Sequence, residues 1–222
     1  MLDIRNRPVI VVGGDRVAAE KATALSASGA HVTVMNADFC AELQEMAARQ
    51  EITLHQKAYE PGDLAGAFVV VATATHDPQL AAAIWNETQQ NGQLVNIVDV
   101  PALCSFIVPS ILRRGQLTIS VSTEGASPSL SKRIRQRLEG LFPSAYDLYM
   151  QIAVVARTHL RQQGIAYDRR DEFFGEFFAS EVLTLLAEDN LSQALALTAE
   201  LLQRYEVSIS TAMLTTELAT VQ

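Results

Sequence analysis

Short apolar runs alternate with helix-like segments over the first half of the chain. The runs are rich in Val, Ile and Ala, and the segments between them carry apolar residues at helical spacing. A strand buried on both faces of a parallel sheet needs such a continuous run, because crossover helices cover both faces. The runs occupy residues 9–12, 31–35, 52–56, 67–72 and 94–98. They predict a Rossmann-like α/β domain on a parallel sheet, with the most apolar run, 67–72, as the best candidate for a central strand.

The pattern becomes extended and then helical after Pro109. Two short extended runs, 110–112 and 117–121, flank Arg113-Arg114-Gly115, which is typical of a hairpin turn. Ser127-Pro128 then predicts the start of a helix, because Ser is a favoured N-cap and Pro fits the first helical position. Beyond Pro143 everything reads as helix, with apolar spacings of three and four. The predicted helices cover 146–163, 171–187 and 191–205, and the polar stretch 207–216 is read as a break.

Composition limits the compartment and the class of partner. Of the 222 residues 49% are hydrophobic, enough for an ordered core in one or two domains. No run approaches the roughly 20 apolar residues that span a bilayer, and the N-terminus lacks the order of a signal peptide. Cys40 and Cys104 lie far apart, so no disulfide framework is indicated. We expect a cytoplasmic protein without a membrane partner, and the net charge of −8 argues against nucleic acid.

A glycine turn follows the first predicted strand. Strand, glycine turn and helix open a dinucleotide-binding unit, where the helix N-terminus binds the pyrophosphate. Against G-x-G-x-x-G/A the chain reads Gly13, Gly14, Asp15, Arg16, Val17 and Ala18. Asp15 thus replaces the second glycine and brings bulk and negative charge to the closest backbone approach. Either Arg16 offsets that charge, or Asp15 caps the helix. The motif leaves a working and a degenerate nucleotide site equally open.

Two further strand ends contribute to this predicted nucleotide site. Asn36 and Asp38 follow the second strand, where an acidic residue usually holds the ribose. Asn36 retains a hydrogen-bonding amide, and Asp38 equally fits a cap for the next helix. No Arg stands there for a 2′-phosphate, which favours NAD over NADP. Thr73, Ala74 and Thr75 end the fourth strand and are expected beside the glycine turn, because ligands bind at the carboxyl ends of strands.

Asp99 lies just past the fifth predicted strand, in Asn96-Ile-Val-Asp-Val-Pro. An acid at this edge of the sheet suits a general base or a metal contact. A loop carboxylate that caps a turn is the alternative, and spacing alone favours it. The four histidines show no spacing typical of metal ligands, so no metal site is predicted.

A basic segment and a serine-rich loop stand out in the middle of the chain. Between residues 113 and 137 six cations face one anion, Glu124, although the whole chain is acidic. The hydroxyls and N–H groups of 122–127, just before a helix, are suited to hold a carboxylate. A small polycarboxylate or phosphate ligand fits this segment, and a solvated helix face is the alternative. No base lies at the spacing of a serine nucleophile, so a hydrolase triad has no support.

Several blocks together resemble one known family. The blocks are VVGGDRVAAEKATAL, GAHVTVMNAD, DLAGAFVVVATATHDPQL and VNIVDVPALCSFIVPSILRRGQLTISVSTEGASPSLSKRIRQRLEGLFP. The last contains N-x-V-D-x-P, S/C-F-x-x-P-[AS]-I and S-T-x-G-x-S-P elements. From about residue 8 to 143 the chain resembles the precorrin-2 dehydrogenase / sirohydrochlorin ferrochelatase family of siroheme synthesis, in the form found in the N-terminal part of siroheme synthase.

This resemblance implies three parts, a reaction and several site residues. The parts are an NAD-binding domain (1–112), a dimerisation segment (113–145) that exchanges strands with a second copy, and a helical domain (146–222). The implied reaction moves a hydride from precorrin-2 to NAD⁺, giving sirohydrochlorin, into which some members insert Fe²⁺. Asp99 matches the catalytic aspartate, and Ser127 the serine of the tetrapyrrole-binding loop. Ser122, Arg113 and Lys132 are expected to contact the carboxylates of the substrate.

Two departures from the family both fall on the nucleotide side. Asp15 replaces the last glycine of a G-G-G turn, and His76 replaces the first aspartate of a T-D-D sequence. They leave an alternative function open: a non-redox tetrapyrrole-binding protein, or a pure chelatase, with a degenerate nucleotide site. The resemblance itself favours an NAD-dependent precorrin-2 dehydrogenase that acts as a homodimer.

Overall fold

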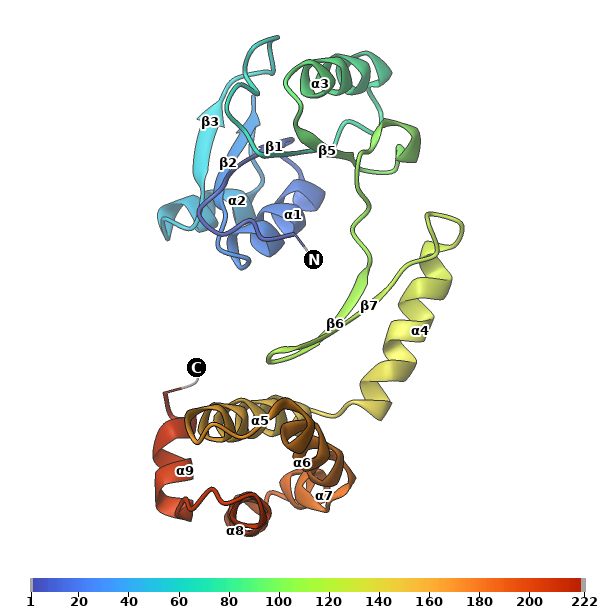
Figure 1. The fold of residues 1–222 in the computed structure, drawn as a ribbon. Coiled ribbons are helices and arrows are strands. Elements are labelled where there is room, and N and C mark those ends of the chain that lie inside the picture. Colours follow the sequence, from blue (N-terminus) through green and yellow to red (C-terminus); the bar gives the residue numbers. More distant parts are fainter. Residues whose placement is uncertain (1, 221–222) are drawn as a thin grey trace. The chain divides into compact units, whose positions relative to one another are not determined.

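A computed structural model describes residues 2–220 of the chain. The chain divides into two compact units, Met1–Val108 and Pro109–Gln222. Figure 1 shows the sheet with its helices in the first unit, and the hairpin and helices in the second. Each unit has buried hydrophobic clusters of its own.

The first unit is a parallel five-stranded sheet in the order β3-β2-β1-β4-β5. The strands are β1 (Pro8–Val12), β2 (His31–Asn36), β3 (Thr53–Gln56), β4 (Val69–Ala72) and β5 (Leu94–Ile97). The helices are α1 (Arg16–Ser26), α2 (Ala41–Ala48) and α3 (Pro78–Gln90), followed by the short 3₁₀ helix η1 (Pro101–Leu103). The predicted Rossmann-like sheet is confirmed. The most apolar run forms β4, which lies inside the sheet between β1 and β5 and is buried at all four residues, as predicted for a central strand.

Alternate residues of the strands supply two separate cores. Val9 and Val11 of β1 pack in one cluster with Ala18 and Ala22 of α1. The opposite face of the sheet packs with α3, whose Ile84 is fully buried. Because successive side chains of a strand point to opposite faces, one apolar run serves both clusters. This explains why β1 and β4 are continuous apolar runs without polar alternation.

The strand order reverses between β1 and β4. From β1 the chain proceeds to β2 and β3 on one side, and then returns to add β4 and β5 on the other. In such sheets a ligand binds beyond the carboxyl ends of the strands at the reversal. The glycine turn after β1 and the small-residue turn after β4 therefore lie at the position where a nucleotide is expected.

The second unit begins with an antiparallel hairpin, β6 (Ser110–Arg114) and β7 (Leu117–Val121), on which α4 (Pro128–Leu141) packs. Arg113 and Arg114 belong to β6 rather than to the turn, a difference from the prediction. Arg114 pairs with Leu117, which leaves only Gly115 and Gln116 for the connection. Gly115 has a positive φ of 53°, as the first residue of so short a hairpin turn requires.

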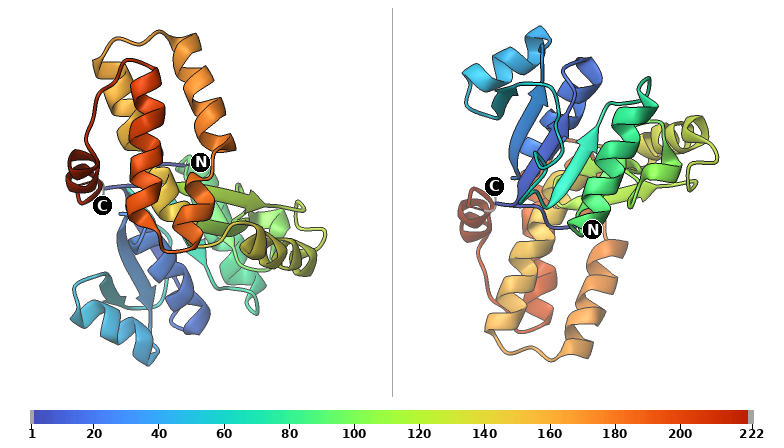
Figure 2. Two further views of the ribbon diagram at one scale, coloured as in Figure 1. Left: turned by 90° about the horizontal axis from the view of Figure 1, so that it is seen from below. Right: turned by 90° about the horizontal axis from the view of Figure 1, so that it is seen from above.

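Five helices complete this unit and enclose one core. They are α5 (Ala145–Gln162), α6 (Tyr167–Ala179), α7 (Val182–Ala187), α8 (Leu191–Arg204) and α9 (Thr211–Leu218). In the two views of Figure 2 they pack beside one another, and α8 contacts the other four. Phe173 and Phe177 are fully buried in the core that these helices share. Within residues 2–220, no helix combines the length and hydropathy needed to cross a membrane.

Two helix predictions in this unit were wrong. The segment 171–187, predicted as one helix, is divided between α6 and α7 at Ser180, whose ψ of 173° is extended. The stretch 207–216, predicted as a break, contains the start of α9. Ser210 caps that helix by accepting a hydrogen bond of 3.2 Å from the N–H of Met213. Only Leu214 and Leu218 of α9 are buried, so its apolar periodicity is too short to recognise.

Candidate functional site

Gly13 and Gly14 are required by the packing of the chain's own strand ends. Gly13 has a φ of 147°, and a Cβ on it would lie 2.0 Å from Oγ1 of Thr73. A Cβ on Gly14 would lie 1.9 Å from the carbonyl oxygen of Asp38. The N–H of Gly13 also donates to the carbonyl of Met35 over 2.9 Å. The ends of β1, β2 and β4 thus meet at this turn, and neither position has room for a side chain.

Asp15 caps α1. Its Oδ1 accepts a hydrogen bond of 2.8 Å from the N–H of Ala18, and its backbone is extended, as an N-cap residue requires. Arg16 does not neutralise it: the Arg16 side chain is 82% exposed and faces Glu20 over 3.7 Å. Of the two alternatives for Asp15, the structure shows the cap. The carboxylate therefore lies at the N-terminus of α1 and occupies one of its N–H groups.

The remaining free donors of α1 fit a pyrophosphate. Within residues 2–220 the backbone N–H groups of Arg16 and Val17, the first two of the helix, have no hydrogen-bond partner. Two free N–H groups at the positive end of a helix suit a phosphate group. Val17 is itself exposed at this end. The residues present therefore fit the nucleotide, although the carboxylate of Asp15 lies beside the same donors.

Asn36 and Asp38, the two residues predicted at the end of β2, play different roles in the structure. Nδ2 of Asn36 donates to the carbonyl of Asp38 over 2.7 Å, which leaves Oδ1 of Asn36 free to accept from a ribose hydroxyl. Asp38 does not cap the following helix. The N-cap of α2 is Cys40, which makes no side-chain capping bond. Asp38 instead supplies the carbonyl that lies against Gly14, and the capping alternative for its side chain was wrong.

The turn after β4 lies against the glycine turn, as predicted. The N–H of Thr73 donates to the carbonyl of Val12 over 2.9 Å, and Oγ1 of Thr73 faces Gly13. Ala74 is buried. Thr75 is directed to the neighbouring strand, where its hydroxyl donates to the carbonyl of Val98 over 3.0 Å. These contacts bring three of the predicted nucleotide residues and the turn before Asp99 to one edge of the sheet.

Asp99 is exposed and has a positive φ of 60°. Its turn is fixed by backbone bonds: Val98 donates to Ala72 over 2.9 Å, and Val100 to Ile97 over 3.1 Å. In the part of the chain that the structure describes, the Asp99 carboxylate accepts no hydrogen bond. The alternative that Asp99 caps its own turn is therefore not supported by any hydrogen bond among the described residues. The carboxylate is free to meet a ligand at the carboxyl edge of the sheet.

Two residues hold the Asp99 turn and were not singled out from the sequence. Nδ2 of Asn96 donates to the carbonyl of Phe106 over 3.0 Å. Sγ of Cys104 lies 3.2 Å from both the N–H and the carbonyl of Ile97. Burial raises the pKa of the Cys104 thiol, so it stays protonated and able to donate. The sequence signal was the close spacing of Asn96 and Cys104 around Asp99, within the block on which the resemblance rests.

The serine-rich loop of the second unit folds on its own hydroxyls. Ser122 Oγ accepts from the N–H of Glu124 over 3.2 Å. Ser127 caps α4 by accepting from the N–H of Leu130 over 3.4 Å, which confirms the predicted N-cap. The N–H of Ser127 in turn donates to Oγ1 of Thr123 over 3.1 Å. The loop is thus held in shape, with Oγ of Ser127 also 3.4 Å from Oγ of Ser129, and the hydroxyl proton of Ser122 remains available to a ligand.

The cations of the basic segment fall into two groups. Two have structural partners: Nε of Arg114 donates to the carbonyl of Phe142 over 2.8 Å, and Arg135 pairs with Glu139. The other four have no carboxylate within 4.0 Å among residues 2–220. They are Arg113, Lys132, Arg133 and Arg137. The predicted substrate residues Arg113 and Lys132 therefore belong to the unpaired, exposed group.

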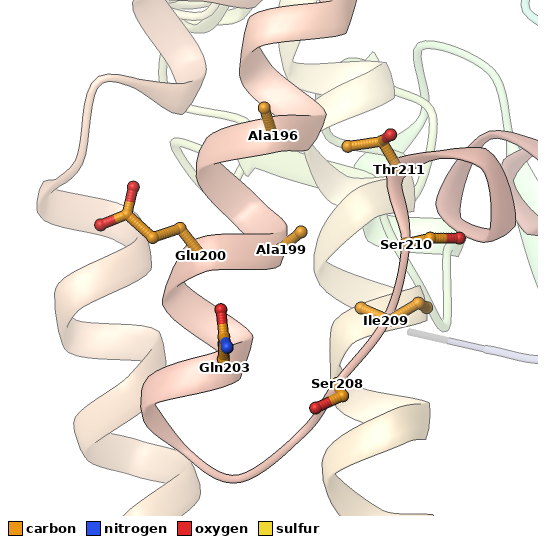
Figure 3. Close-up of a pocket in the computed structure, with 8 residues that line it drawn as sticks. All are labelled: Ala196, Ala199, Glu200, Gln203, Ser208, Ile209, Ser210 and Thr211. Carbon is orange, nitrogen blue, oxygen red and sulfur yellow. The ribbon is translucent and has the colours of Figure 1, made fainter.

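Other features of the described residues lie outside these predicted sites. A cavity of about 540 Å³ is lined by α8 and by the segment that leads into α9, and it contains none of the predicted residues (Figure 3). Among residues 2–220, no three His, Cys, Asp or Glu side chains gather closely enough to hold a metal ion.

Comparison with known sequences points to siroheme synthesis. Residues 1–110 match the family described as putative NAD(P)-binding, and residues 114–141 match the one described as sirohaem biosynthesis protein central. Siroheme synthase of Photorhabdus laumondii is 35% identical over 193 residues, 87% of this chain and 41% of that protein. Siroheme synthase of Zymomonas mobilis is 38% identical over 184 residues, 81% of this chain and 39% of that protein. The chain spans about two fifths of the length of these curated relatives.

Comparison with solved structures agrees. The structure of SirC, precorrin-2 dehydrogenase, is similar to this one with a TM-score of 0.71 at 28% sequence identity. The match covers 87% of this chain and 96% of that one. Three kinds of observation point to the same family. They are the sequence blocks, the fold with its parallel sheet, hairpin and helical part, and the two comparisons. The chain therefore belongs to the precorrin-2 dehydrogenase / sirohydrochlorin ferrochelatase family of siroheme synthesis.

Proposed function

We propose that this chain oxidises precorrin-2 to sirohydrochlorin with NAD⁺. The observation that carries the proposal is the likeness to SirC, precorrin-2 dehydrogenase, which extends over 96% of that chain. A match of this extent includes more than a nucleotide-binding fold. When bound, NAD⁺ supplies the acceptor for the hydride that leaves the macrocycle, and the accompanying proton leaves to a base or to solvent.

The first unit holds the nucleotide in this proposal. The N–H groups of Arg16 and Val17 donate to the pyrophosphate, and Oδ1 of Asn36 accepts from a ribose hydroxyl. Gly13 and Gly14 carry no side chain that would keep the pyrophosphate away from the backbone of this turn. Thr73, Ala74 and Thr75 line the neighbouring edge. Two observations support this placement. The first two N–H groups of α1 are free, and the turns after β1 and β4 lie where the strand order of the sheet reverses.

Asp99 is the proposed catalytic base. Its carboxylate is exposed, has no hydrogen-bond donor among the described residues, and follows the strand next to β4. A general base must reach its proton directly or through one water, and an unpaired side chain at the ligand edge meets that condition. The hydrogen bond from Thr75 to Val98, and the bonds of Asn96 and Cys104, hold the backbone from which Asp99 projects.

The second unit supplies the proposed contacts to the carboxylates of the substrate. Arg113 and Lys132 are exposed and unpaired among the described residues, and charge-assisted hydrogen bonds to carboxylates are the strong ones. Ser122 keeps a hydroxyl donor, and Ser127 presents at the start of α4 a hydroxyl that lies 3.4 Å from Oγ of Ser129. The surplus of cations in this segment of an acidic chain is what supports a polyanionic ligand here.

We also propose that the chain acts as a homodimer in the cytoplasm. The support is the hairpin: β6 and β7 form a sheet of two strands, which exposes unpaired backbone groups on both edges. Helix α4 packs on this hairpin and leaves its edges to pair with further strands. Exchange of strands with a second copy would extend the two-stranded sheet. In this proposal residues 1–112 bind NAD, 113–145 form the dimer and 146–222 are the helical part.

A second candidate is a tetrapyrrole-binding protein or chelatase without redox activity. The specific observation in its favour is Asp15, whose carboxylate occupies one N–H group of α1 and repels a pyrophosphate. In that case Fe²⁺ would be a substrate inserted into sirohydrochlorin, with Asp99 assisting. NAD⁺ binding separates the two candidates, because only the dehydrogenase needs it.

The test is to titrate NAD⁺ into the purified chain by calorimetry and to follow NADH formation with precorrin-2. Asp99→Asn is the matched variant, because Asn tolerates the positive φ of 60° while its amide cannot accept the proton. The proposal expects NAD⁺ binding in both proteins and turnover only in the wild type. Sirohydrochlorin binding without any NAD⁺ binding would instead support the second candidate.

A further inference from the structure

Three arginines of the helical unit surround a small cavity for which the proposed function has no use. The cavity has a volume of about 100 Å³ and lies between α5 and α6. Its lining consists of Arg157, Arg161, Tyr167, Arg170, Asp171 and Phe174. None of these residues belongs to the proposed nucleotide or tetrapyrrole contacts.

The helix register explains how these side chains meet. Arg157 and Arg161 are four residues apart, so they lie on one face of α5. Tyr167, Arg170, Asp171 and Phe174 recur at spacings of three and four, so they lie on one face of α6. Gly164, with a φ of 69°, reverses the chain between the two helices. Two successive faces thus bring three guanidinium groups to one cavity.

Two of the three arginines stack on aromatic rings of α6. The guanidinium of Arg157 lies 4.8 Å from the ring centroid of Phe174, and that of Arg170 lies 6.0 Å from the ring of Tyr167. Stacking on an aromatic face orients the planar donor group while leaving its N–H edges free. Across residues 2–220, none of the three has a carboxylate within 4.0 Å.

The charges of the lining residues indicate which kind of ligand the cavity would bind. Three guanidinium groups face one carboxylate, that of Asp171, which leaves an excess of two positive charges. Tyr167 adds a hydroxyl donor. About 100 Å³ is a few times the ≈30 Å³ share of one water, which is room for an oxyanion and too little for a nucleotide or a macrocycle. Arginine forks match the oxygens of phosphate in a bidentate manner.

We propose that this cavity, termed the α5–α6 arginine site, binds a phosphate group, either as inorganic phosphate or as the phosphate of a small ester. The doubly charged phosphate balances the excess charge of the site, whereas a single carboxylate does not. The three arginines donate to its oxygens, and Asp171 limits the affinity by like-charge repulsion.

The experiment is a calorimetric titration of the full chain with inorganic phosphate, and in parallel with glycerol phosphate, at constant ionic strength. Arg161→Gln and Arg170→Gln each remove one charged donor, which should weaken binding about tenfold. Arg169→Gln is the matched control: it makes the same charge change on the same helix at a residue that does not line the cavity. It should stay within about twofold of the wild type, since the Arg169 guanidinium stacks on the ring of Tyr205, 5.1 Å from its centroid, and does not line the cavity.

Asp171→Asn gives a result of opposite sign. Removing the one anion of the site should tighten phosphate binding, an effect that damage to the fold would not produce. Tighter binding of glycerol phosphate than of phosphate would assign the site to an ester, and the reverse order to the free ion. The proposal is overturned if the wild type binds neither, if Arg169→Gln weakens binding as much as Arg170→Gln, or if Asp171→Asn fails to tighten it.

Discussion

The hydroxyl of Thr75 donates a 3.0 Å hydrogen bond to the carbonyl of Val98. This bond joins the turn after β4, where a nucleotide is proposed to bind, to the turn after β5, from which Asp99 projects. The peptide that accepts it immediately precedes Asp99. The position of the proposed base is therefore set partly by a residue of the proposed nucleotide site.

Thr75→Val keeps the shape of the side chain and removes this bond. We expect a loss of about 1 kcal/mol in the free energy of unfolding, because the Val98 carbonyl loses its side-chain donor. We also expect slower turnover of precorrin-2, because the Asp99 turn is less well fixed. Urea unfolding and NADH formation measure the two effects. Thr75→Ser, which restores the hydroxyl, should recover both, and equal activity of all three proteins would refute a positioning role.

Asp15→Asn separates the two effects of Asp15. Asn caps helices about as well as Asp, so stability should be retained, whereas Asp15→Ala should lose about 1 kcal/mol. Removal of the negative charge beside the free N–H groups of Arg16 and Val17 should tighten NAD⁺ by about 1 kcal/mol, roughly fivefold. Asp15→Gly should also tighten NAD⁺, because it removes both charge and bulk. Calorimetry gives the affinities, and unchanged binding in Asp15→Asn would mean that the carboxylate does not face the pyrophosphate.

Gly14→Ala tests whether the glycine turn is fixed by the chain itself. The added Cβ would lie 1.9 Å from the backbone carbonyl of Asp38, which cannot rotate away as a side chain can. We expect a destabilisation above the roughly 1–3 kcal/mol that is usual for overpacking. Gly175→Ala, inside α6 with no atom within 4 Å of the new Cβ, is the control and should stabilise by about 0.5–1 kcal/mol. Thermal unfolding of the two variants should therefore shift in opposite directions.

The buried Tyr149 should make the stability of the helical unit depend on pH in the alkaline range. It is 3% exposed, and burial, with a smaller contribution from Tyr146, raises its pKa from the ordinary 10.0 to about 12. Between these two values the folded state binds more protons than the unfolded state, so stability is full below pH 10 and falls as pH rises toward 12.

Tyr149→Phe should reduce this alkaline loss, because the ionising group is gone. At neutral pH the variant should be about 1 kcal/mol less stable, since the hydroxyl donates to the carbonyl of Phe177 over 3.1 Å. Urea unfolding at neutral pH and at several alkaline pH values measures both effects. The account of Tyr149 fails if the two proteins lose stability in parallel above pH 10.

The sheet of the first unit was predictable mainly because its inner strands β1 and β4 are buried on both faces. A short continuous apolar run such as Val69–Ala72 is typical of such a strand, and the glycine turn marks where β1 ends. Helix ends were predictable where local chemistry sets them, as with Ser127 and Pro128 at α4. The break at Ser180 was missed because apolar residues continue at helical spacing on both sides of it.

The sequence predicted which residues of the candidate site lie near one another better than it predicted the hydrogen bonds that they make. The sequence placed Thr73 beside Gly13, because carboxyl ends of adjacent parallel strands share an edge. It left two alternatives for Asp15, which only the 2.8 Å bond to Ala18 resolved in favour of the cap. Nor did it separate Arg114, which caps α4 through Phe142, from the unpaired Arg113 next to it. Such pairings depend on side-chain geometry that residue spacing does not encode.

Hydride transfer from precorrin-2 is the most direct test of the account. The purified chain is mixed with precorrin-2 and saturating NAD⁺, and NADH and sirohydrochlorin are followed together, with Asp99→Asn as the comparison. We predict one NADH for each sirohydrochlorin formed by the wild type, and loss of both products in the Asp99→Asn variant, which should still bind NAD⁺. Full activity of Asp99→Asn, or no NADH from a folded wild type that binds sirohydrochlorin, would contradict this prediction.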